Sequence, residues 1–503
     1  MPTLDPYTPP ATATDEYCLT MPRVYWLEGM NELTTFSLTV RTLPRNYGYL
    51  IAAGLEDVLR YLERFRFTDA ELEALATHTV DPFDSASPRL YEDGFLSFLA
   101  DLRFTGEVYA MPEGTPFYAN EPIARIVAPR IEATIIEPAL LSIFNRQTAV
   151  ATKAARMVSV AGGRPLWEAG LRRAPGPETG PANARAAYIG GMVGTSNVHA
   201  RLVHGVPSTG TSAHAYVMSW GEGHEQVAFE VWLKHNPHRA SVLVDTYDIP
   251  RAIDRAIAAS RAVGVPLKGI RIDSGVLAVE TRSARAQLDD ARATLDAAGM
   301  QDTTLLADLR PTRTSIMPTG DMDEYTISDL LANGGVMDSS YSGTALVNPG
   351  PIGGVYKLGH QEVDDLAERW VMKKAAGKAT DPGRLQVHRC ADHDVISLAD
   401  EVVVGGRPLL KRVMALGKVV GEQPPLPQIR DYAMAQVAAL PDDIRAVREP
   451  TTRPVHRTRR LWELRDRLGD PVAVEHLRPQ PADAEPYDDH TAAWLAHYAP
   501  AAA

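Results

Sequence analysis

The stretch "SVLVDTYDIPRAIDRAIAASRAVGVPLKGIRID" (Ser241 to Asp273) alternates two short apolar runs with one helical pattern. Each apolar run, 241–245 and 269–273, ends in an acid and has the length and composition of a buried β-strand. Between them, apolar residues recur on one side of a helix that Gly264 ends. A strand, a helix and a second strand in this order predict a βαβ unit and therefore a parallel sheet.

The same alternation continues downstream. A second helical pattern over 288–298 stops at Gly299, and the run 303–308 begins a third unit. The Arg- and Pro-rich segment 308–320 is expected to form a loop. Acids at the carboxyl ends of strands lie where α/β barrels place their active sites. The middle of the chain is therefore predicted to be an α/β domain built from βα units.

Helices are predicted before this region and β-hairpins after it. Apolar spacing over 55–65 indicates a helix, and Thr68 with Glu71 forms the capping-box pattern that begins another. A longer helix is predicted over 140–160. From about residue 386, the short alternating runs in "LQVHRCADHDVISL" and "EVVVGGRPLL" are typical of β-hairpins.

The composition indicates a globular enzyme. A chain of 503 residues has room for two or three domains, and 45% hydrophobic residues can fill their cores. The net charge of −12 argues against a nucleic-acid-binding protein. Two cysteines, Cys18 and Cys390, are too few for a disulfide framework or a zinc module. We find no secretory signal and no apolar run of bilayer length, so a cytoplasmic enzyme without membrane contact is expected.

Two adjacent arginines, Arg172 and Arg173, stand between glycines in "GLRRAPG". Guanidinium groups bind phosphate oxygens bidentately, and glycine lets backbone amides approach an anion closely. Two solvated surface arginines beside ordinary turns would have the same spacing. Gly343 and Thr344 are a candidate phosphate cradle, for which a plain turn is the alternative interpretation.

Asp273 and His214 are candidates for further chemistry. A carboxylate at the end of a strand, such as Asp273, can hold Mg²⁺ or ribose hydroxyls. Capping of the following helix is the alternative, as it is for Asp245 and Asp248. His214 lies in a small-residue turn before a predicted strand, and a structural histidine is the alternative to a catalytic one. The cluster "HRCADHD" is assigned to a hairpin turn without a function.

Ten short motifs, taken together and in order, resemble the nicotinate phosphoribosyltransferases over about residues 15–468. They are "TDEYCLTM", "YLIAAGLEDVLRYLERFRF", "FNRQTAVATKAAR", "GLRRAPG", "AAYIGGMVGTSNV", "GTSAHAYVMS", "LVDTYD", "RIDSG", "GDMDEY" and "GGVYKL". The resemblance implies an α/β fold with an irregular α/β barrel beside an α/β sandwich domain, and a homodimer with shared active sites. The expected divisions are a flexible leader (1–14), a sandwich domain (15–135), a barrel-like domain (136–360), a β-hairpin and helical part completing the sandwich (361–470), and a tail (471–503).

The resemblance also implies a reaction. Phosphoribosyl pyrophosphate and an aromatic carboxylate, nicotinate, would give a mononucleotide and pyrophosphate, as in NAD salvage. ATP hydrolysis would be coupled through transient phosphorylation of a histidine, which matches His214. Arg271 and Asp273 would contact the ribose, the pyrophosphate and its Mg²⁺, with Asp273 as the metal ligand. Arg172 would bind the pyrophosphate or the 5′-phosphate region.

The resemblance implies further substrate contacts. Those residues are Tyr17, Ser196, Thr211, Gly320, Asp321, Gly343 and Thr344. Tyr17 would reach across the dimer to stack on the acceptor ring, and the Gly320–Asp321 loop would meet the ribose hydroxyls. Ser196 takes the place of an aspartate in nicotinamide-using relatives. An acid there would repel a carboxylate, so serine favours an acidic acceptor.

The chain departs from the family's pattern on the side that faces the acceptor ring. Ala169 replaces an aromatic residue that stacks on the pyridine, and Val193 and Val276 replace acids in "GGMVGTSN" and "DSGVL". Nicotinate as acceptor, with another side chain covering its ring, is one interpretation. A bulkier aromatic or heteroaromatic acid in a specialised pathway is a second. An inactive homologue that only binds a ligand is a third.

Overall fold

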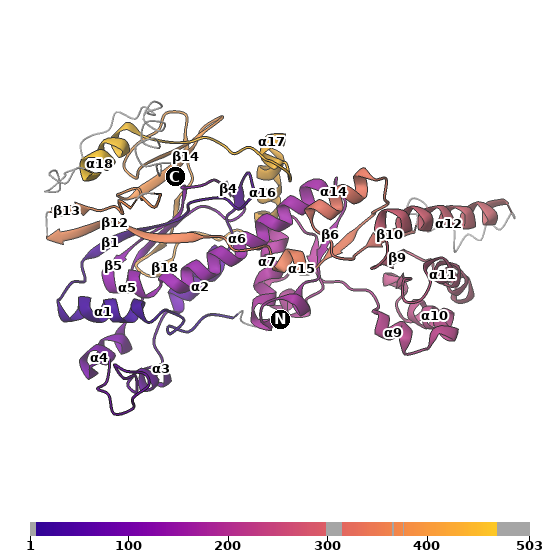
Figure 1. Cartoon of the computed structure of the whole chain (residues 1–503), viewed down its shortest axis with the longest axis horizontal. Helices are drawn as coiled ribbons and strands as arrows, with labels where there is room; N and C mark the ends of the chain where they lie inside the picture. Colours follow the sequence, from indigo (N-terminus) through magenta and orange to yellow (C-terminus); the bar gives the residue numbers. More distant parts are fainter. Residues whose placement is uncertain (1–6, 298–313, 365–366, 376, 470–503) are drawn as a thin grey trace, which may run out of the picture. The chain divides into compact units, whose positions relative to one another are not determined.

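The computed structural model describes residues 7–297, 314–364, 367–375 and 377–469 (Figure 1). They divide into two compact units: a first unit over 150–349, and a second unit built from 7–149 and the described residues from 350 onward. The expected barrel-like domain, 136–360, contains the whole of the first unit. The expected domain boundaries themselves stay a prediction. Within the described ranges, no helix is both long and apolar enough to cross a membrane.

The βαβ prediction is confirmed in the first unit. β8 (Ser241–Leu243) and β9 (Gly269–Ile272) pair in parallel and are joined by α11 (Ile249–Val263). The Asp248 side chain caps the start of α11, so the capping interpretation is right for this residue. Gly264, with a φ of +66°, ends the helix in the left-handed conformation that glycine adopts readily.

A third strand completes this sheet. β10 (Ser315–Pro318) pairs in parallel with β9, and the strand order is β10-β9-β8. The loop prediction for 308–320 is therefore wrong over β10. Ile316 and Met317 are buried, and Pro318 is the last residue of the strand, where its missing N–H is tolerated. The predicted run 303–308 and the predicted helix end at Gly299 lie outside the described residues.

A second parallel sheet lies in the same unit. β6 (Leu166–Glu168) lies between β11 (Ser340–Ser342) and β7 (Gly194–Thr195). Two residues before β11, the Asp338 N–H donates to the carbonyl of Ile316 on β10 at 2.9 Å. This hydrogen bond links the two parallel sheets. Within the described residues of this unit, six parallel strands in two groups of three thus form an irregular barrel-like arrangement, as the fold class predicted.

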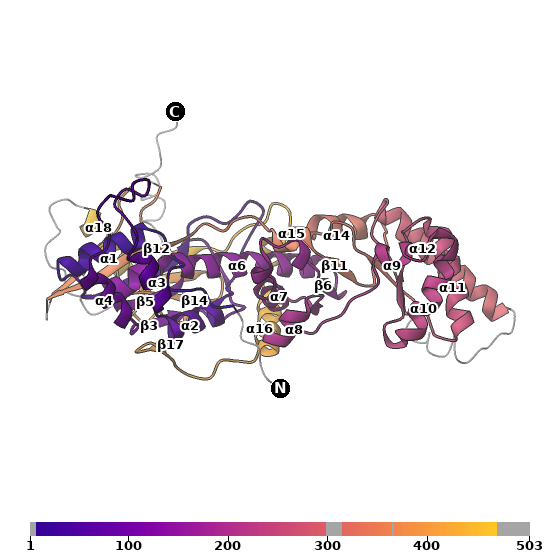
Figure 2. The same cartoon turned by 90° about the horizontal axis from the view of Figure 1, so that it is seen from below.

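Helices cover these strands. Figure 1 shows α10, α11 and α12 beside β9 and β10, and Figure 2 shows the three helices grouped together. Phe229, Val242 and Ile253 belong to one buried apolar cluster of these helices and strands. The remaining helices of the first unit are α7 (Gly180–Ile189), α8 (Val198–His204), α9 (His214–Met218), α10 (Glu225–His235), α12 (Leu277–Ala297), α14 (Glu324–Ala332) and α15 (Thr344–Val347). The long helix α6 (Glu137–Val160) contributes residues to both units.

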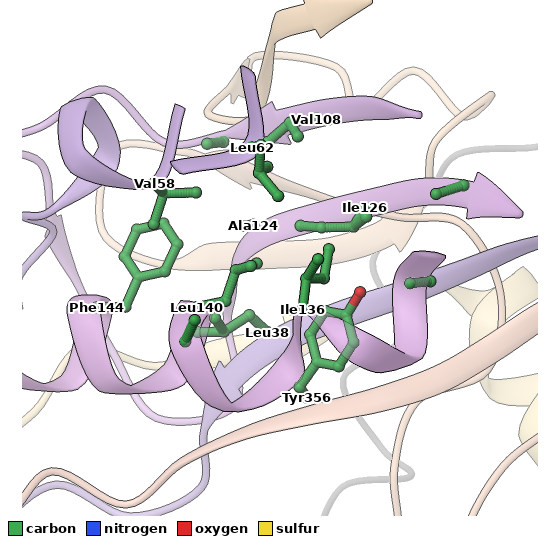
Figure 3. Close-up of a cluster of buried hydrophobic side chains, with 14 of the residues drawn as sticks. Leu38, Val58, Leu62, Val108, Ala124, Ile126, Ile136, Leu140, Phe144 and Tyr356 are labelled. Carbon is green, nitrogen blue, oxygen red and sulfur yellow. The ribbon is translucent and has the colours of Figure 1, made fainter. Parts of the chain in front are cut away.

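The second unit is built around a seven-stranded antiparallel sheet. Its order is β13-β12-β1-β5-β3-β17-β18. The bounds are β13 (Ala367–Trp370), β12 (Gly354–Asp364), β1 (Leu33–Val40), β5 (Pro122–Pro129), β3 (Glu107–Ala110), β17 (Lys411–Ala415) and β18 (Lys418–Val419). α2 (Leu55–Arg64) and α6 bury apolar side chains against this sheet, and Figure 3 shows Val58, Leu62, Leu140 and Phe144 gathered with Ile126 in one buried cluster.

The other elements of the second unit are short. The helices are α1 (Tyr17–Leu27), α3 (Asp69–Leu75), α4 (Asp93–Asp101), α5 (Arg130–Ile135), α16 (Leu426–Ala438), α17 (Asp442–Arg445) and α18 (Arg459–Gly469). The strands are β2 (Leu50–Ile51), β4 (Pro116–Phe117), β14 (Leu385–Arg389), β15 (Asp394–Leu398), β16 (Arg407–Pro408) and β19 (Val455–Arg457). The predicted helices at 55–65 and 140–160 are confirmed, and so is the capping box between Thr68 and Glu71.

One C-terminal hairpin was predicted correctly and one was not. β14 and β15 pair antiparallel, with "HRCADHD" at their turn. In "EVVVGGRPLL", only β16 is a strand, and it pairs with just two residues at the end of β14. Val402 and Val404 are 74% and 87% exposed, so no partner strand covers the apolar run that suggested a hairpin.

A buried acid pair joins two segments of the second unit that lie far apart in the sequence. Glu121 and Asp394 are both buried, and Asp394 accepts hydrogen bonds from Arg389 at 2.7 Å and Arg453 at 2.9 Å. Burial, followed by the neighbouring Asp394 carboxylate, raises the pKa of Glu121 well above its ordinary value of 4.5. Burial acts to raise the pKa of Asp394 too, but the hydrogen bond from Arg389 outweighs it and the pKa is lowered. Glu121 therefore holds the proton of the pair.

Replacing Glu121 by glutamine is expected to weaken the fall in stability that accompanies rising pH. Because the folded pKa of Glu121 lies above its unfolded value, the stability it contributes is complete below the unfolded pKa and is lost as the pH rises through the folded pKa. Glutamine stays neutral, so this loss should disappear. Urea unfolding between about pH 5 and about pH 9 measures it. The exposed Glu422→Gln variant should keep the wild-type slope, and an unchanged slope in Glu121→Gln would contradict the assignment.

Candidate active site

A cavity of about 570 Å³ opens in the first unit at the carboxyl ends of its parallel strands. Among the described strands of this unit, β9 and β11 contribute residues to its wall, and the residues directly after β6, β7 and β10 line it as well. The wall is made by residues of the segments 169–173, 210–214, 319–321 and 341–344, together with Ser196, Arg271 and Asp273. Carboxyl ends of parallel strands meet at one edge, which explains why segments far apart in sequence converge here.

Arg271 and Asp273 form the charged centre of the cavity. Nη2 of Arg271 lies 3.1 Å from Oδ1 of Asp273, and its Nε donates to the Thr319 hydroxyl at 2.9 Å. Thr319 in turn donates to the Asp273 carboxylate. Burial acts to raise the pKa of Asp273, but the hydrogen bond from Thr319 and the charge of Arg271 outweigh it, so the pKa is lowered. Asp273 is therefore held as a carboxylate.

His214 lies beside this carboxylate. Its Nε2 is 3.9 Å from Oδ2 of Asp273, and its Nδ1 lies 3.2 Å from the Thr246 hydroxyl, so both ring nitrogens face polar groups. The prediction of a strand directly after His214 is wrong, because His214 is the first residue of α9. The residues that suggested a strand belong to α9, and one of them, Val217, packs into the buried apolar cluster of the first unit.

Asp245 hydrogen-bonds to the chain that carries Asp273. Its Oδ2 accepts hydrogen bonds from the Asp273 N–H at 3.0 Å and from the Ser274 hydroxyl at 2.7 Å. The acid at the end of β8 thus fixes the chain at the end of β9. It is not a helix cap, and it does not line the cavity.

The guanidinium groups of Arg172 and Arg173 line the cavity from a short 3₁₀ turn, Leu171–Arg173. Both residues are exposed, and within the described residues neither side chain forms an ion pair or a hydrogen bond. The Arg173 backbone carbonyl accepts from the Asn348 side chain at 3.0 Å, which holds the turn. Two cations on a fixed turn are suited to an anionic ligand.

Glycines bring backbone close to the charged centre. A Cβ at Gly320 would lie 2.5 Å from the Asp273 carbonyl oxygen, so only glycine fits between the ends of β9 and β10. A Cβ at Gly343 would lie 3.1 Å from the Ala169 carbonyl oxygen. Asp321 follows with a φ of +42°, a conformation that aspartate tolerates better than most residues.

A buried glutamate fixes the chain around Ala169 and Ser196. Glu168 accepts hydrogen bonds from the Gly170 N–H and the Thr195 hydroxyl, and its burial raises its pKa. Its carbonyl accepts from the Ser196 N–H at 2.8 Å. The Ala169 N–H donates to the Ser342 carbonyl at 2.7 Å. These bonds place Ala169 and Ser196 against the cavity.

The cavity brings together most of the residues singled out in the sequence. They are Ala169, Arg172, Ser196, Thr211, His214, Arg271, Asp273, Gly320, Asp321, Gly343 and Thr344. Val193 and Val276 do not line it, and Val276 is 67% exposed. Tyr17 is a half-exposed residue at the start of α1 in the second unit.

Sequence reasoning missed Thr319, Tyr341 and the supporting Glu168. The signal for Thr319 was a polar residue directly after the short run "SIMP", which the loop prediction concealed. Tyr341 and Glu168 lie in short strands that were not predicted.

The chain matches the family model for the nicotinate phosphoribosyltransferase N-terminal domain over residues 12–145 and that for the C-terminal domain over 387–465. It is 34% identical to a nicotinate phosphoribosyltransferase of Mycobacterium tuberculosis over 449 residues, which cover 87% of this chain and 89% of the relative. It is 33% identical to the Bacillus subtilis nicotinate phosphoribosyltransferase over 487 residues, which cover 89% and 93%.

The fold agrees with these similarities. The crystal structure of human nicotinic acid phosphoribosyltransferase superposes with a TM-score of 0.76 at 26% identity, covering 91% of this chain and 100% of the human chain. The nicotinate-nucleotide pyrophosphorylase of Pyrococcus furiosus shares the fold, with a TM-score of 0.65 at 23% identity over 85% of this chain and 95% of that one. The chain is therefore a phosphoribosyltransferase that belongs to the nicotinate phosphoribosyltransferase family.

Proposed function

We propose that this protein transfers the phosphoribosyl group of phosphoribosyl pyrophosphate to nicotinate, giving nicotinate mononucleotide and pyrophosphate. The observation that carries the proposal is one cavity in which Arg172 and Arg173, whose side chains have no ion pair within the described residues, lie beside the Arg271–Asp273 centre. The names of the relatives, nicotinate phosphoribosyltransferases in M. tuberculosis and B. subtilis, support the choice of acceptor.

The residue types suit the chemistry. The bond from the anomeric carbon to the pyrophosphate oxygen breaks, and a bond from the pyridine nitrogen to that carbon forms. Positive charge develops on the ribose and negative charge on the leaving pyrophosphate. Arg172 and Arg271 would stabilise the leaving group, while the cavity wall positions the ring nitrogen against the carbon. The Gly343–Thr344 turn would hold the 5′-phosphate, and Gly320 and Asp321 would meet the ribose hydroxyls.

The carboxylates of the cavity fit a magnesium ion. Mg²⁺ is usually held by one or two carboxylates and completed by substrate phosphates. Asp273 and Asp321 both line the cavity, and Asp273 is held in its charged form. We propose Asp273 as the metal ligand. Bound there, Mg²⁺ would neutralise charge on the pyrophosphate.

His214 is proposed as a phosphate acceptor that couples ATP hydrolysis to the transfer. Neutral imidazole is nucleophilic near pH 7. Hydrogen bonding at Nδ1 by Thr246 and proximity of Nε2 to the cavity carboxylate fix the ring, with Nε2 directed towards the site where phosphates would bind. The γ-phosphoryl group of ATP would pass to a ring nitrogen with release of ADP, and then to water with release of inorganic phosphate.

Replacing His214 by alanine is therefore expected to abolish the stimulation of the transfer rate by ATP. The phosphorylated form of the protein should also disappear, because the acceptor nitrogen is gone. Initial rates with and without ATP, together with intact-protein mass spectrometry after incubation with ATP, measure the two effects. His224→Ala, an exposed histidine outside the cavity, is the control and should behave as wild type. ATP stimulation that survives unaltered in His214→Ala would contradict the coupling.

A bulkier aromatic acid is the second candidate acceptor. Ala169 lines the cavity with only a methyl group, which leaves room for a larger ring system than pyridine. Ser196 also lines the cavity and adds no negative charge, so an acidic acceptor is favoured in either case. The contributions assigned to Val193 and Val276 stay predictions.

We further propose a homodimer in which Tyr17 contacts the acceptor of a second copy. The exposed face of α1 supports this, since Tyr17, Met21, Val24 and Leu27 are all exposed at helical spacing. The cytoplasmic location expected from the sequence also stays a prediction.

Product mass spectrometry tests the proposed function. The protein is incubated with phosphoribosyl pyrophosphate and Mg²⁺, with and without ATP, against nicotinate, nicotinamide, quinolinate and larger aromatic acids. Nicotinate mononucleotide is the expected product. An adduct formed only with a larger acid would favour the second candidate, and no adduct with any acceptor would favour a protein that only binds its ligand.

A further inference from the structure

Tyr341 lines the cavity. Among the described residues that line the cavity, its phenol is the only aromatic side chain besides the imidazole of His214. Burial raises the pKa of Tyr341, so the hydroxyl stays protonated. The side chain is therefore a neutral, flat surface in a cavity whose other large side chains are mostly charged.

The ring of Tyr341 is held in place by its neighbours. Tyr341 on β11 is paired with Trp167 on β6, and their ring centroids lie 6.2 Å apart with 24° between the planes. Trp167 is itself pressed against β7, because a Cβ at Gly194 would lie 2.5 Å from its six-membered ring. Gly194 on β7 thus makes room for Trp167 on β6, and the Trp167 ring packs against Tyr341 on β11.

Tyr341 and Ala169 come from neighbouring strand ends. The Ala169 N–H donates to the carbonyl of Ser342, the residue after Tyr341, at 2.7 Å. Both residues line the same cavity, so a ring bound between them would meet the methyl group of Ala169, directly after β6, and the phenol of Tyr341 on β11. Of these two, only the phenol has a face large enough to stack on an aromatic acceptor.

We infer that Tyr341 is the specificity-determining residue that contacts the aromatic ring of the acceptor. This inference rests on the proposed function, because it requires an aromatic acceptor in this cavity. An electron-poor ring that carries a carboxylate stacks favourably in an offset arrangement on the electron-rich phenol. The contact is made by the ring and not by the hydroxyl, which separates it from a role in binding phosphate.

Two substitutions at Tyr341 separate the contribution of the aromatic ring from that of the hydroxyl. Tyr341→Phe keeps the stacking face, and its KM for nicotinate should stay within about twofold of wild type. Tyr341→Leu removes the aromatic face while keeping an apolar side chain, and its KM for nicotinate should rise about tenfold. The KM for phosphoribosyl pyrophosphate should change less than about twofold in both variants, because the donor does not contact the ring. Tyr247→Leu, a partly exposed tyrosine of the same unit outside the cavity, is the matched control.

The outcomes separate this inference from the function on which it rests. A wild-type protein that forms no nicotinate mononucleotide overturns the proposed function and this inference with it. A wild type that forms the product while Tyr341→Leu keeps the wild-type KM for nicotinate overturns the inference alone. A rise in the KM for phosphoribosyl pyrophosphate in Tyr341→Phe would assign the hydroxyl to the donor and would also overturn it.

Discussion

Replacing Asp273 by asparagine is expected to lower kcat/KM by about two to three orders of magnitude, the scale seen when one preorganised electrostatic group is removed from an active site. The amide has nearly the shape of the carboxylate but carries no charge. It cannot attract Mg²⁺ as a carboxylate does, and it no longer pairs with Arg271 at 3.1 Å. Arg271 would keep its positive charge but would lose the carboxylate that now pairs with it.

Initial rates at varied Mg²⁺ and varied phosphoribosyl pyrophosphate measure this effect. Because the proposed carboxylate ligand is gone, the Mg²⁺ concentration for half-maximal rate should rise together with the fall in kcat/KM. Asp254→Asn is the matched control: Asp254 is an exposed aspartate on α11 outside the cavity, and its variant should keep the wild-type rate. A loss of rate in Asp273→Asn below tenfold, with unchanged Mg²⁺ dependence, would exclude Asp273 as the metal ligand.

Local patterns predicted the elements near Asp273 because those elements are determined by local physics. The strands β8 and β9 are short apolar runs, α11 has an Asp cap and a terminal glycine, and the parallel pairing follows from the connection. The capping box at Thr68 and Glu71 is equally local, and the structure has it. Such features depend on residues within one or two turns of each other.

The network around Asp273 could not be predicted in the same way, because it depends on contacts between distant segments. Thr319 meets Asp273 across 46 positions of sequence, and Asp245 meets Ser274 across 29. No periodicity encodes such distances, and only the placement of strand ends at one edge creates them. Tyr341 was missed for the same reason, since a three-residue strand carries no pattern of its own.

The sequence resemblance supplied what the local patterns did not. It indicated His214, Arg271 and Asp273 as a group before their geometry was known, and the cavity brings them together. It also indicated Val193 and Val276 beside the acceptor; neither residue lines the cavity, and their contribution stays a prediction. A motif carries over the backbone position of a residue, while the direction of its side chain depends on the packing around it.

The second large effect is expected on stability, from a buried ion network between α6 and α14 in the first unit. Oε2 of Glu324 lies 2.5 Å from Nζ of Lys153, and its Oε1 lies 3.1 Å from Nε of Arg156. The side chains of Glu324 and Arg156 are almost completely buried, and only 10% of the Lys153 side chain is exposed. One carboxylate thus compensates two buried cations.

Replacing Glu324 by alanine is expected to lower the free energy of unfolding by about 3–5 kcal/mol, because both cations remain in a low dielectric without this carboxylate. Urea unfolding measures the change as a lower midpoint at unchanged slope. Glu222→Ala is the matched control, since it breaks an ion pair of the same unit, 3.7 Å from Arg251, in which both side chains are more than half exposed. That variant should lose less than about 1 kcal/mol. Equal losses in the two variants would mean that burial does not strengthen the Glu324 network, whereas a loss confined to Glu324→Ala would identify it as a main stabilising contact between α6 and α14.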